Sequence, residues 1–424
     1  MISGFGQAHN VRTLSDHAIE NQAEGRAEPA GGAPTGGRPT IFLSAAEASG
    51  DEHAARLIAA LRRRLPGARF VGVAGERMAA EGCEVIADLS RQASMGTGPF
   101  LRLGYYLRAL RRVRRAIREI RPDVLVPVDS PAWNWHLAKT ARGIGSPVVY
   151  YIAPQVWAWA PWRVRKVAAL TDAVACILPF EEPYFRHRGV RAVYVGHPLL
   201  ETLPARGQMP DILEAWAHGQ WRVALLPGSR PGEITHHAGV LAAAAKAIRR
   251  RWPRSRCTFV VRDEASAEHL RRALGGPVPA GADIVVGRTR EMLAQSHFAV
   301  AVSGTVTLEV AHFGVPMVVV YRVGLLFRLL HRLTGKWAVP TPHFALANIL
   351  AGRRIVPEFM PWRGRTRQVI DMVMELMEEP GYLLEARQDL VAAVDSLGKG
   401  AGGTASDNAA DLIVRLLEKK RLAT

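Results

Sequence analysis

The chain has 424 residues, of which 48% are hydrophobic, so its composition is that of a globular protein long enough for two domains or more. Lysine and arginine outnumber aspartate and glutamate, 55 against 38, and the net charge of +17 favours a phosphate-bearing partner: nucleic acid, a nucleotide sugar or an anionic membrane. No stretch reaches the roughly 18 apolar residues of a membrane span, so we expect that the chain does not cross a membrane.

The chain begins with a segment of low complexity. Residues 1–38 are rich in glycine, alanine, proline and polar residues and contain no apolar run, which predicts a disordered tail rather than a signal peptide. Three cysteines, Cys83, Cys176 and Cys257, lie far apart and fit neither a disulfide framework nor a zinc site. Together these features favour a cytoplasmic protein.

Short apolar runs then alternate with helical patterns along the rest of the chain. The predicted strands are Thr40–Ser44, Arg69–Val73, Asp123–Val128, Val148–Ile152, Ala173–Leu178, Ala192–Val195, Arg222–Leu226, Thr258–Val261, Asp283–Val286, Phe298–Val302 and Met317–Val320. Uniformly apolar strands separated by helices indicate parallel sheets that are covered on both faces. The sequence therefore predicts an α/β protein with two doubly wound, Rossmann-like domains, residues 39–200 and 201–400, and a closing amphipathic helix in residues 401–424.

In doubly wound sheets, ligands bind beyond the carboxyl ends of the strands. Two strand-loop-helix segments, residues 45–51 and 303–309, could therefore face each other across a cleft. The residues that follow predicted strands and should surround this cleft are Glu47, Gly75, Asp129, Pro154, Gly228 and Ser303.

The first half supplies candidate acid-base groups. Asp129 ends a buried strand beside aromatic residues, and a carboxylate there can serve as a general base with a raised pKa. The alternative is a helix N-cap or a hydrogen bond that orders the loop. Glu47, Ser49 and Asp51 lie within five residues after the first strand. We expect at least one of the three to contact the acceptor, while helix capping is the alternative for Ser49 or Asp51.

The second half has the parts of a nucleotide clamp. In the predicted loop at residues 228–233, Gly228 permits a tight turn, Ser229 offers a hydroxyl, Arg230 presents a guanidinium to phosphate oxygens, and Glu233 could hold that arginine. A plain strand-to-helix turn is the alternative.

A similar element follows a later strand. The amides of Ser303, Gly304 and Thr305 could approach phosphate at a helix start, and Glu309 lies where it could accept hydrogen bonds from a ribose diol. The alternative for Glu309 is an exposed position on that helix.

Two further features suggest contact with lipid. Five of the ten tryptophans fall between Trp133 and Trp162, where they could touch acyl chains or sugar faces, although core packing is the commoner role of a tryptophan. The helical stretch Leu101–Arg121 has one apolar face and one arginine-rich face, which is typical either of a solvated surface helix or of a helix on anionic headgroups. The basic, apolar segment Tyr321–Trp337 would reinforce the second interpretation.

These residues are similar to a known family. The chain resembles the lipid-A-disaccharide synthases, inverting glycosyltransferases of the two-domain GT-B type. The matching strings occur in the family's order between about residues 40 and 360: residues 47–51, 72–78, 95–96, 129–131 with Asn134, 151–159, 178–181, 195–197, 226–230 with Glu233, 303–305 with 308–309, and 348–352.

The resemblance implies a reaction and a set of roles. It implies transfer of diacylglucosamine from UDP to the 6-hydroxyl of 2,3-diacylglucosamine 1-phosphate (lipid X), without a metal or other cofactor, by an enzyme on the cytoplasmic face of the inner membrane. Asp129 would be the base. The nucleotide-sugar side would comprise Gly228, Ser229, Arg230, Glu233, Ser303, Gly304, Thr305, Glu309, Tyr321 and Asn348, and the acceptor side Glu47, Ser49, Asp51 and Met95. An oligomer is possible.

The sequence departs from the family's pattern mainly on the acceptor side. Ala46 replaces a usual glycine, Pro99 stands where an acidic residue is expected, and Ala132 replaces a second acid near Asp129. Two alternatives remain at this point: a related GT-B transferase or epimerase that uses another UDP-sugar, and, from a different class, a nucleic-acid-binding protein. The second alternative lacks a recognisable binding module.

Overall fold

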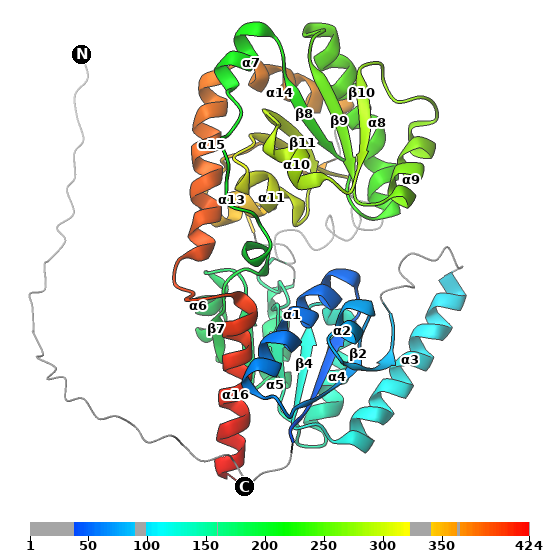
Figure 1. Ribbon diagram of the computed structural model, residues 1–424, viewed down its shortest axis with the longest axis vertical. Helices are drawn as coiled ribbons and strands as arrows, with labels where there is room; N and C mark the ends of the chain where they lie inside the picture. Colours follow the sequence, from blue (N-terminus) through cyan, green and yellow to red (C-terminus); the bar gives the residue numbers. More distant parts are fainter. Residues whose placement is uncertain (1–37, 90–98, 159, 323–340, 363–364, 424) are drawn as a thin grey trace, which may run out of the picture. The chain divides into compact units, whose positions relative to one another are not determined.

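The computed structural model describes residues 38–89, 99–158, 160–322, 341–362 and 365–423 (Figure 1). The remaining residues, among them Met95 and most of the Tyr321–Trp337 segment, lie outside the described part of the chain.

The first sheet has seven parallel strands in the order β3-β2-β1-β4-β5-β6-β7. Its strands are β1 (Thr40–Ala45), β2 (Arg69–Val73), β3 (Glu84–Ala87), β4 (Val124–Val128), β5 (Val149–Tyr151), β6 (Ala173–Cys176) and β7 (Ala192–Tyr194). The helices between them are α1 (Ala48–Arg64), α2 (Glu76–Ala80), α3 (Pro99–Ile120), α4 (Pro131–Arg142), α5 (Val164–Leu170) and α6 (Glu181–Arg186), with the 3₁₀ turn η1 (Pro161–Arg163) before α5; a second 3₁₀ turn, η2 (Pro198–Glu201), follows β7.

The second sheet has six parallel strands in the order β10-β9-β8-β11-β12-β13. Its strands are β8 (Arg222–Leu226), β9 (Arg256–Val261), β10 (Ala282–Val286), β11 (Phe298–Val302), β12 (Met317–Arg322) and β13 (Glu358–Trp362). Its helices are α7 (Ile212–His218), α8 (Pro231–Arg251), α9 (Glu264–Leu274), α10 (Thr289–Ala294), α11 (Val306–His312), α13 (Leu346–Ala351), α14 (Thr366–Glu378) and α15 (Pro380–Asp395), followed by η3 (Ser396–Gly398).

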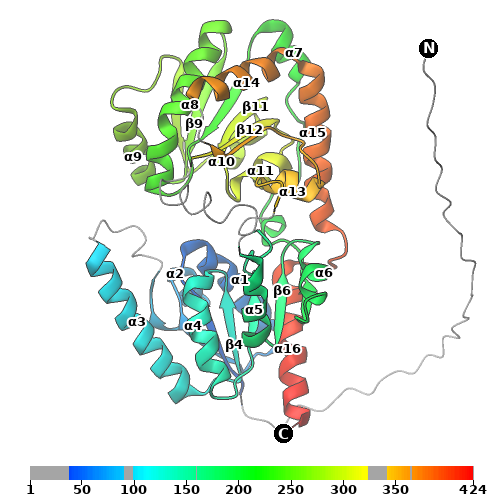
Figure 2. The same cartoon turned by 180° about the vertical axis from the view of Figure 1, so that it is seen from behind.

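The sequence-based fold class is confirmed, since both sheets are parallel, Rossmann-like and covered by helices (Figures 1 and 2). Strands β1, β4, β8 and β11 are almost wholly buried, because apolar side chains on both faces pack against helices. Strands β3 and β13 were not predicted. Both lie at sheet edges, and β3 has no fully buried residue, so its sequence lacks the apolar run of a central strand.

The last helix, α16 (Ala405–Ala423), returns to the first sheet. It packs along α1, and its apolar residues Ala409, Ile413 and Leu416 join the core cluster that also contains β1 and β4 (Figure 1). Arg64 of α1 also forms an ion pair with Asp407 at 2.8 Å. Helix α16 is thus part of the same hydrophobic core as β1, α1 and β4.

Among the described residues, no helix combines the length and the apolar character that would be needed to cross a bilayer.

Candidate active site

The loop after β4 presents Asp129 in an unusual backbone conformation. Asp129 and Ser130 have φ angles of 48° and 43°, in the left-handed region that few non-glycine residues adopt. The carbonyl of Asp129 accepts hydrogen bonds from Asn134 Nδ2 and Tyr150 Oη, both at 2.7 Å, and its amide donates to the Tyr151 carbonyl at 3.1 Å. Three hydrogen bonds therefore fix the backbone of Asp129, and the fixed backbone sets the direction of its side chain.

Burial raises the pKa of the Asp129 carboxyl above its usual value. The amide of Ser130 lowers this pKa by hydrogen bonding, the charge of Glu47 raises it, and the charge of Arg230 lowers it. A carboxylate with a raised pKa is the type of group that can remove a proton from a hydroxyl near neutral pH.

The strand register explains why Glu47 and Asp129 are neighbours. Strands β1 and β4 are adjacent and parallel, and Ala45 is paired with Val128. Glu47, at the start of α1, comes two residues after Ala45, and Asp129 comes one residue after Val128. Both residues therefore lie at the same edge of the sheet. This is the neighbourhood that the strand-end rule predicts.

The loop after β8 is shaped by Gly228 and Glu233. Gly228 has a φ angle of 99°, and an added Cβ atom would lie 2.7 Å from both the Cβ and the Oε2 atoms of Glu233. Glu233 Oε2 accepts hydrogen bonds from the amides of Ser229, at 3.0 Å, and Arg230, at 3.2 Å. Glu233 thus holds the loop backbone directly, while its second oxygen lies 3.8 Å from the Arg230 guanidinium.

One contact joins the two sheets' loops at this point. Arg230 Nη2 donates to Glu47 Oε2 at 3.1 Å, and both side chains are partly exposed. Glu47, Asp129 and Arg230 consequently form one charged cluster: two carboxylates from the first sheet and a guanidinium from the second.

Ser303, Gly304 and Thr305 occupy the loop between β11 and α11. The Ser303 amide donates to the Val320 carbonyl at 3.2 Å, which ties the loop to β12, while Gly304 and Thr305 are exposed. Strand β11 is adjacent to β8, so this loop and the Arg230 loop leave the same edge of the second sheet. A phosphate group could be contacted from both loops.

Glu309 lies one turn into α11 and is partly buried. Burial raises the pKa of its carboxyl, and Arg290 lowers it through its charge and a hydrogen bond from Nε at 3.3 Å. Arg290 also donates to the hydroxyl of Thr202 at 2.8 Å and to the carbonyl of the same residue. That Glu309 binds a ribose stays a prediction, and Arg290, which sequence reasoning missed, holds its carboxylate in place.

Tyr321 stands at the end of β12, with its ring centroid 5.8 Å from that of His237 in α8. The Arg322 amide donates to His237 Nε2 at 2.8 Å, so Nδ1 carries the proton and donates to the Glu233 carbonyl at 2.6 Å. Burial lowers the pKa of His237, which favours this neutral form. His237 therefore links the end of β12 to the Arg230 loop, a role that the sequence did not reveal.

Of the residues predicted on the acceptor side, Asp51 forms hydrogen bonds with the backbone of a neighbouring element. The buried carboxylate of Asp51 accepts hydrogen bonds from the amides of Gly75, Arg77 and Met78, at 2.7, 2.9 and 3.2 Å, and so fixes the start of α2. Asp51 lies within α1, so it stabilises a later helix than the one whose capping was the alternative, and its contact with the acceptor stays a prediction. Ser49 is exposed in the first turn of α1.

Asn348 is fully buried in α13, and all of its hydrogen bonds go to the segment that follows. Its Oδ1 atom accepts from the amides of Ile355, at 2.8 Å, and Val356, at 3.0 Å, and its Nδ2 atom donates to the Val356 carbonyl at 2.9 Å. The side chain thus fixes residues 355 and 356, and its contact with the nucleotide sugar stays a prediction.

A buried carboxylate that was not predicted as a site residue lies near the loop after β5. Glu181 has no exposed surface; its Oε1 atom accepts from the Trp157 indole at 2.9 Å, and its Oε2 atom accepts from the amides of Ile177 and Leu178, both at 3.1 Å. Burial raises the pKa of this carboxyl to about 7, although the three hydrogen bonds oppose the shift. Glu181 thereby fixes the Trp157 ring, which also meets Phe180 edge-on at 4.8 Å between centroids.

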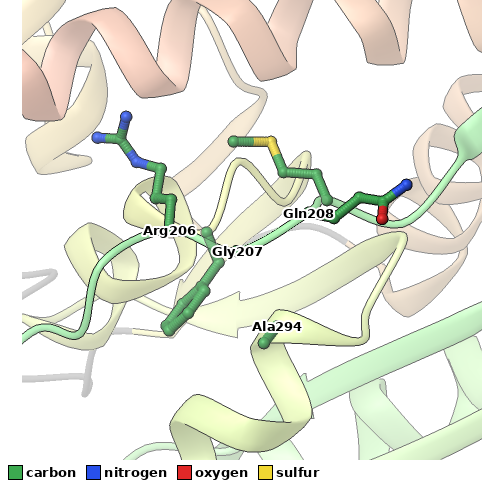
Figure 3. A pocket seen from close by; sticks show the side chains of 6 residues that line it. Arg206, Gly207, Gln208 and Ala294 are labelled. Carbon is green, nitrogen blue, oxygen red and sulfur yellow. The ribbon is translucent and has the colours of Figure 1, made fainter.

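Two cavities lie near these elements. The larger, which we call the aromatic pocket, has a volume of about 600 Å³, and its walls include Trp157, Phe180 and Tyr184 on one side and residues 349–352 of α13 and its end on the other. The smaller, between Arg206, Gln208 and Ala294, measures about 30 Å³ (Figure 3). The small cavity has room for about one or two water molecules only, so it is no substrate site.

A sequence model of the family described as Lipid-A-disaccharide synthetase matches residues 41–390. The chain belongs to this family. Lipid-A-disaccharide synthases of Myxococcus xanthus and Syntrophus aciditrophicus are 36% and 32% identical, over 91% and 89% of this chain and 99% and 98% of their own lengths. The predicted family and enzyme class, a glycosyltransferase of lipid A disaccharide synthesis, are confirmed.

Solved structures agree on the fold. The MnaA–UDP structure from S. aureus has a TM-score of 0.55 at 11% identity, covering 89% of this chain and 95% of its own. The UDP-GlcNAc 2-epimerase of Neisseria meningitidis, solved with UDP-GlcNAc, has a TM-score of 0.54 at 12% identity, covering 90% and 99%. At these identities the likeness establishes the two-domain GT-B fold alone.

Proposed function

We propose that the enzyme transfers 2,3-diacylglucosamine from UDP to the 6-hydroxyl of 2,3-diacylglucosamine 1-phosphate. The acceptor oxygen forms a bond to the anomeric carbon while the bond from that carbon to the UDP oxygen breaks, so the configuration inverts. The acceptor's proton passes to a carboxylate, and the products are UDP and a β-1,6-linked disaccharide 1-phosphate. The observation that carries this proposal is the cluster of Glu47, Asp129 and Arg230, which joins a base to a phosphate-binding cation.

Asp129 is the proposed base. Its backbone is fixed by three hydrogen bonds, and burial favours the protonated product of the transfer, so the carboxylate is a stronger base than an exposed aspartate. Glu47 is the second carboxylate of the cluster, and its ion pair with Arg230 makes it the candidate for positioning that arginine rather than for taking the proton. Of the acceptor-side residues predicted beside it, Ser49, Asp51 and Met95 stay predictions.

Arg230 and the loop at residues 303–305 are proposed to stabilise the departing diphosphate. A guanidinium forms paired, charge-assisted hydrogen bonds with phosphate oxygens, and exposed amides at a helix start add partial positive charge. Two-thirds of the Arg230 side chain is exposed, so it can exchange its contact with Glu47 for a phosphate. Glu309, held by Arg290, is the proposed partner of the ribose.

A membrane surface is the proposed location of the reaction, because both substrates carry acyl chains. Helix α3 supports this proposal: Val113 and Ile117 are buried on one face, and the exposed residues of the other face include Arg108, Arg111, Arg112, Arg115 and Arg118. Leu107 on α3 and Trp162 in η1 are large exposed apolar side chains. Such a combination suits anionic headgroups at the cytoplasmic face of the inner membrane. Nucleic acid is not part of the proposal.

The test is a product assay in mixed micelles that contain both acylated substrates. Wild-type enzyme is expected to form one disaccharide per UDP released, identified by mass spectrometry. Incubation with UDP-N-acetylglucosamine alone is the comparison, because an epimerase would alter that sugar without lipid. Epimerised sugar and no disaccharide would overturn the proposal.

A further inference from the structure

The aromatic pocket adjoins both halves of the proposed active site. Trp157 follows β5, and β5 is the direct neighbour of β4, at whose end Asp129 is hydrogen-bonded to Tyr151. The opposite wall is formed by α13, which packs against α11. Leu308, which precedes Glu309 in α11, belongs to the same apolar cluster as Trp157 and Ile349. The walls of the pocket thus pack against the helix that carries Glu309.

The walls of the pocket suit an apolar occupant. The only polar atom of the Trp157 indole donates to Glu181, so the ring offers the pocket carbon surface alone. Phe180 meets this ring edge-on, and Ile349 and Leu350 face them from α13. The lining residues in the described part of the chain include no lysine, arginine, aspartate or glutamate. A diphosphate or a sugar phosphate would find no charged partner there.

We propose that the aromatic pocket holds one acyl chain of the donor, an inference that rests on the proposed function. Its volume of about 600 Å³ is that of a small-molecule site, for which roughly 300–1,000 Å³ is usual. The donor supplies the chain because the wall formed by α13 adjoins α11, the helix of the proposed ribose partner. Glu181 acts as a positioning residue, since it holds the Trp157 ring at the pocket wall.

The test places a larger side chain on one wall of the pocket and so reduces its volume. Ala351 is half-buried, lines the pocket and ends α13 just before Gly352, which is in the left-handed conformation. The variant Ala351→Leu adds three carbon atoms there. Ala273→Leu is the matched control, because Ala273 is half-buried near the end of α9, which is also followed by a left-handed glycine.

The readout is kcat/KM for disaccharide formation in two series. In the first, the acyl chains of the donor are shortened in steps and the acceptor is full-length; in the second, the acyl chains of the acceptor are shortened and the donor is full-length. For wild type and Ala273→Leu, kcat/KM is expected to fall about fourfold per methylene removed from the donor. Ala351→Leu should lose about tenfold or more with the full-length donor and regain it as the chain shortens, with unchanged affinity for UDP.

Other results of these measurements would contradict the inference. Equal donor-length profiles in wild type and Ala351→Leu would overturn the pocket assignment while leaving the proposed function intact. A change in the acceptor-length profile alone would overturn the choice of donor. If Ala351→Leu fails to fold, Ile349→Ala, which enlarges the pocket, should shift the optimum to longer donors. A wild type that binds UDP but makes no disaccharide would reject the proposed function and this inference with it.

Discussion

Replacing Asn348 by alanine distinguishes a structural role from contact with the nucleotide sugar. In the wild type, Asn348 satisfies two amides and one carbonyl, and these groups belong to Ile355 and Val356, which are both buried. Each buried polar group that loses its partner costs about 1–3 kcal/mol, and water can restore part of this. We therefore expect Asn348→Ala to lower the free energy of unfolding by about 2–5 kcal/mol.

Urea unfolding followed by circular dichroism measures this loss, and titration calorimetry measures UDP affinity below the unfolding transition. The matched control is Asn408→Ala, because the side chain of half-buried Asn408 donates one hydrogen bond, to the Val195 carbonyl at 3.0 Å. The control should lose only about 0.5–1.5 kcal/mol. A stable Asn348→Ala protein with UDP affinity reduced tenfold or more, on the order of 1.4 kcal/mol, would refute the structural interpretation.

Three further outcomes are expected. Gly228→Ala should weaken UDP binding by roughly tenfold, measured by calorimetry, because the new Cβ must displace Glu233 from a loop with positive φ; an unchanged Kd would contradict this. Glu181 has a pKa of about 7 against 4.5 when unperturbed, so it is protonated more readily in the folded state, and its contribution to stability, at most about 3 kcal/mol, is lost as the pH rises through 7. Urea unfolding of Glu181→Gln between pH 4.5 and 8 should show a smaller decline than wild type, and a parallel decline would reject the assignment. Glu47→Gln removes a charge that raises the pKa of Asp129 and should move the acidic limb of the kcat profile to lower pH, by less than about one pH unit; movement to higher pH would contradict the cluster.

Most of the fold could be predicted because buried parallel strands are uniformly apolar. β1, β4, β8 and β11 appear in the sequence as such runs, whereas β3 (EVIA) and β13 (EFMPW) are short and each begins with a glutamate. Parallel order then brings strand ends together. The proximity of Glu47 and Asp129 follows from that rule.

The roles of individual polar residues were harder to predict. Asp51 and Glu47 lie four positions apart after the same strand, yet Asp51 is turned inward to three amides and Glu47 outward to Arg230. Sequence spacing gives no sign of that difference, which depends on where α2 packs. Arg290 and His237 act through partners distant in sequence, so no local pattern could reveal them.

The central claim is that Asp129 takes the acceptor's proton, and a single-turnover rate with both acylated substrates saturating tests it most directly. With Asp129→Ala, we expect the rate of disaccharide formation to fall about a hundredfold or more, while the affinity for UDP stays within about twofold of wild type. Disaccharide formation by Asp129→Ala at a rate similar to wild type would contradict the claim and assign the proton transfer to another group.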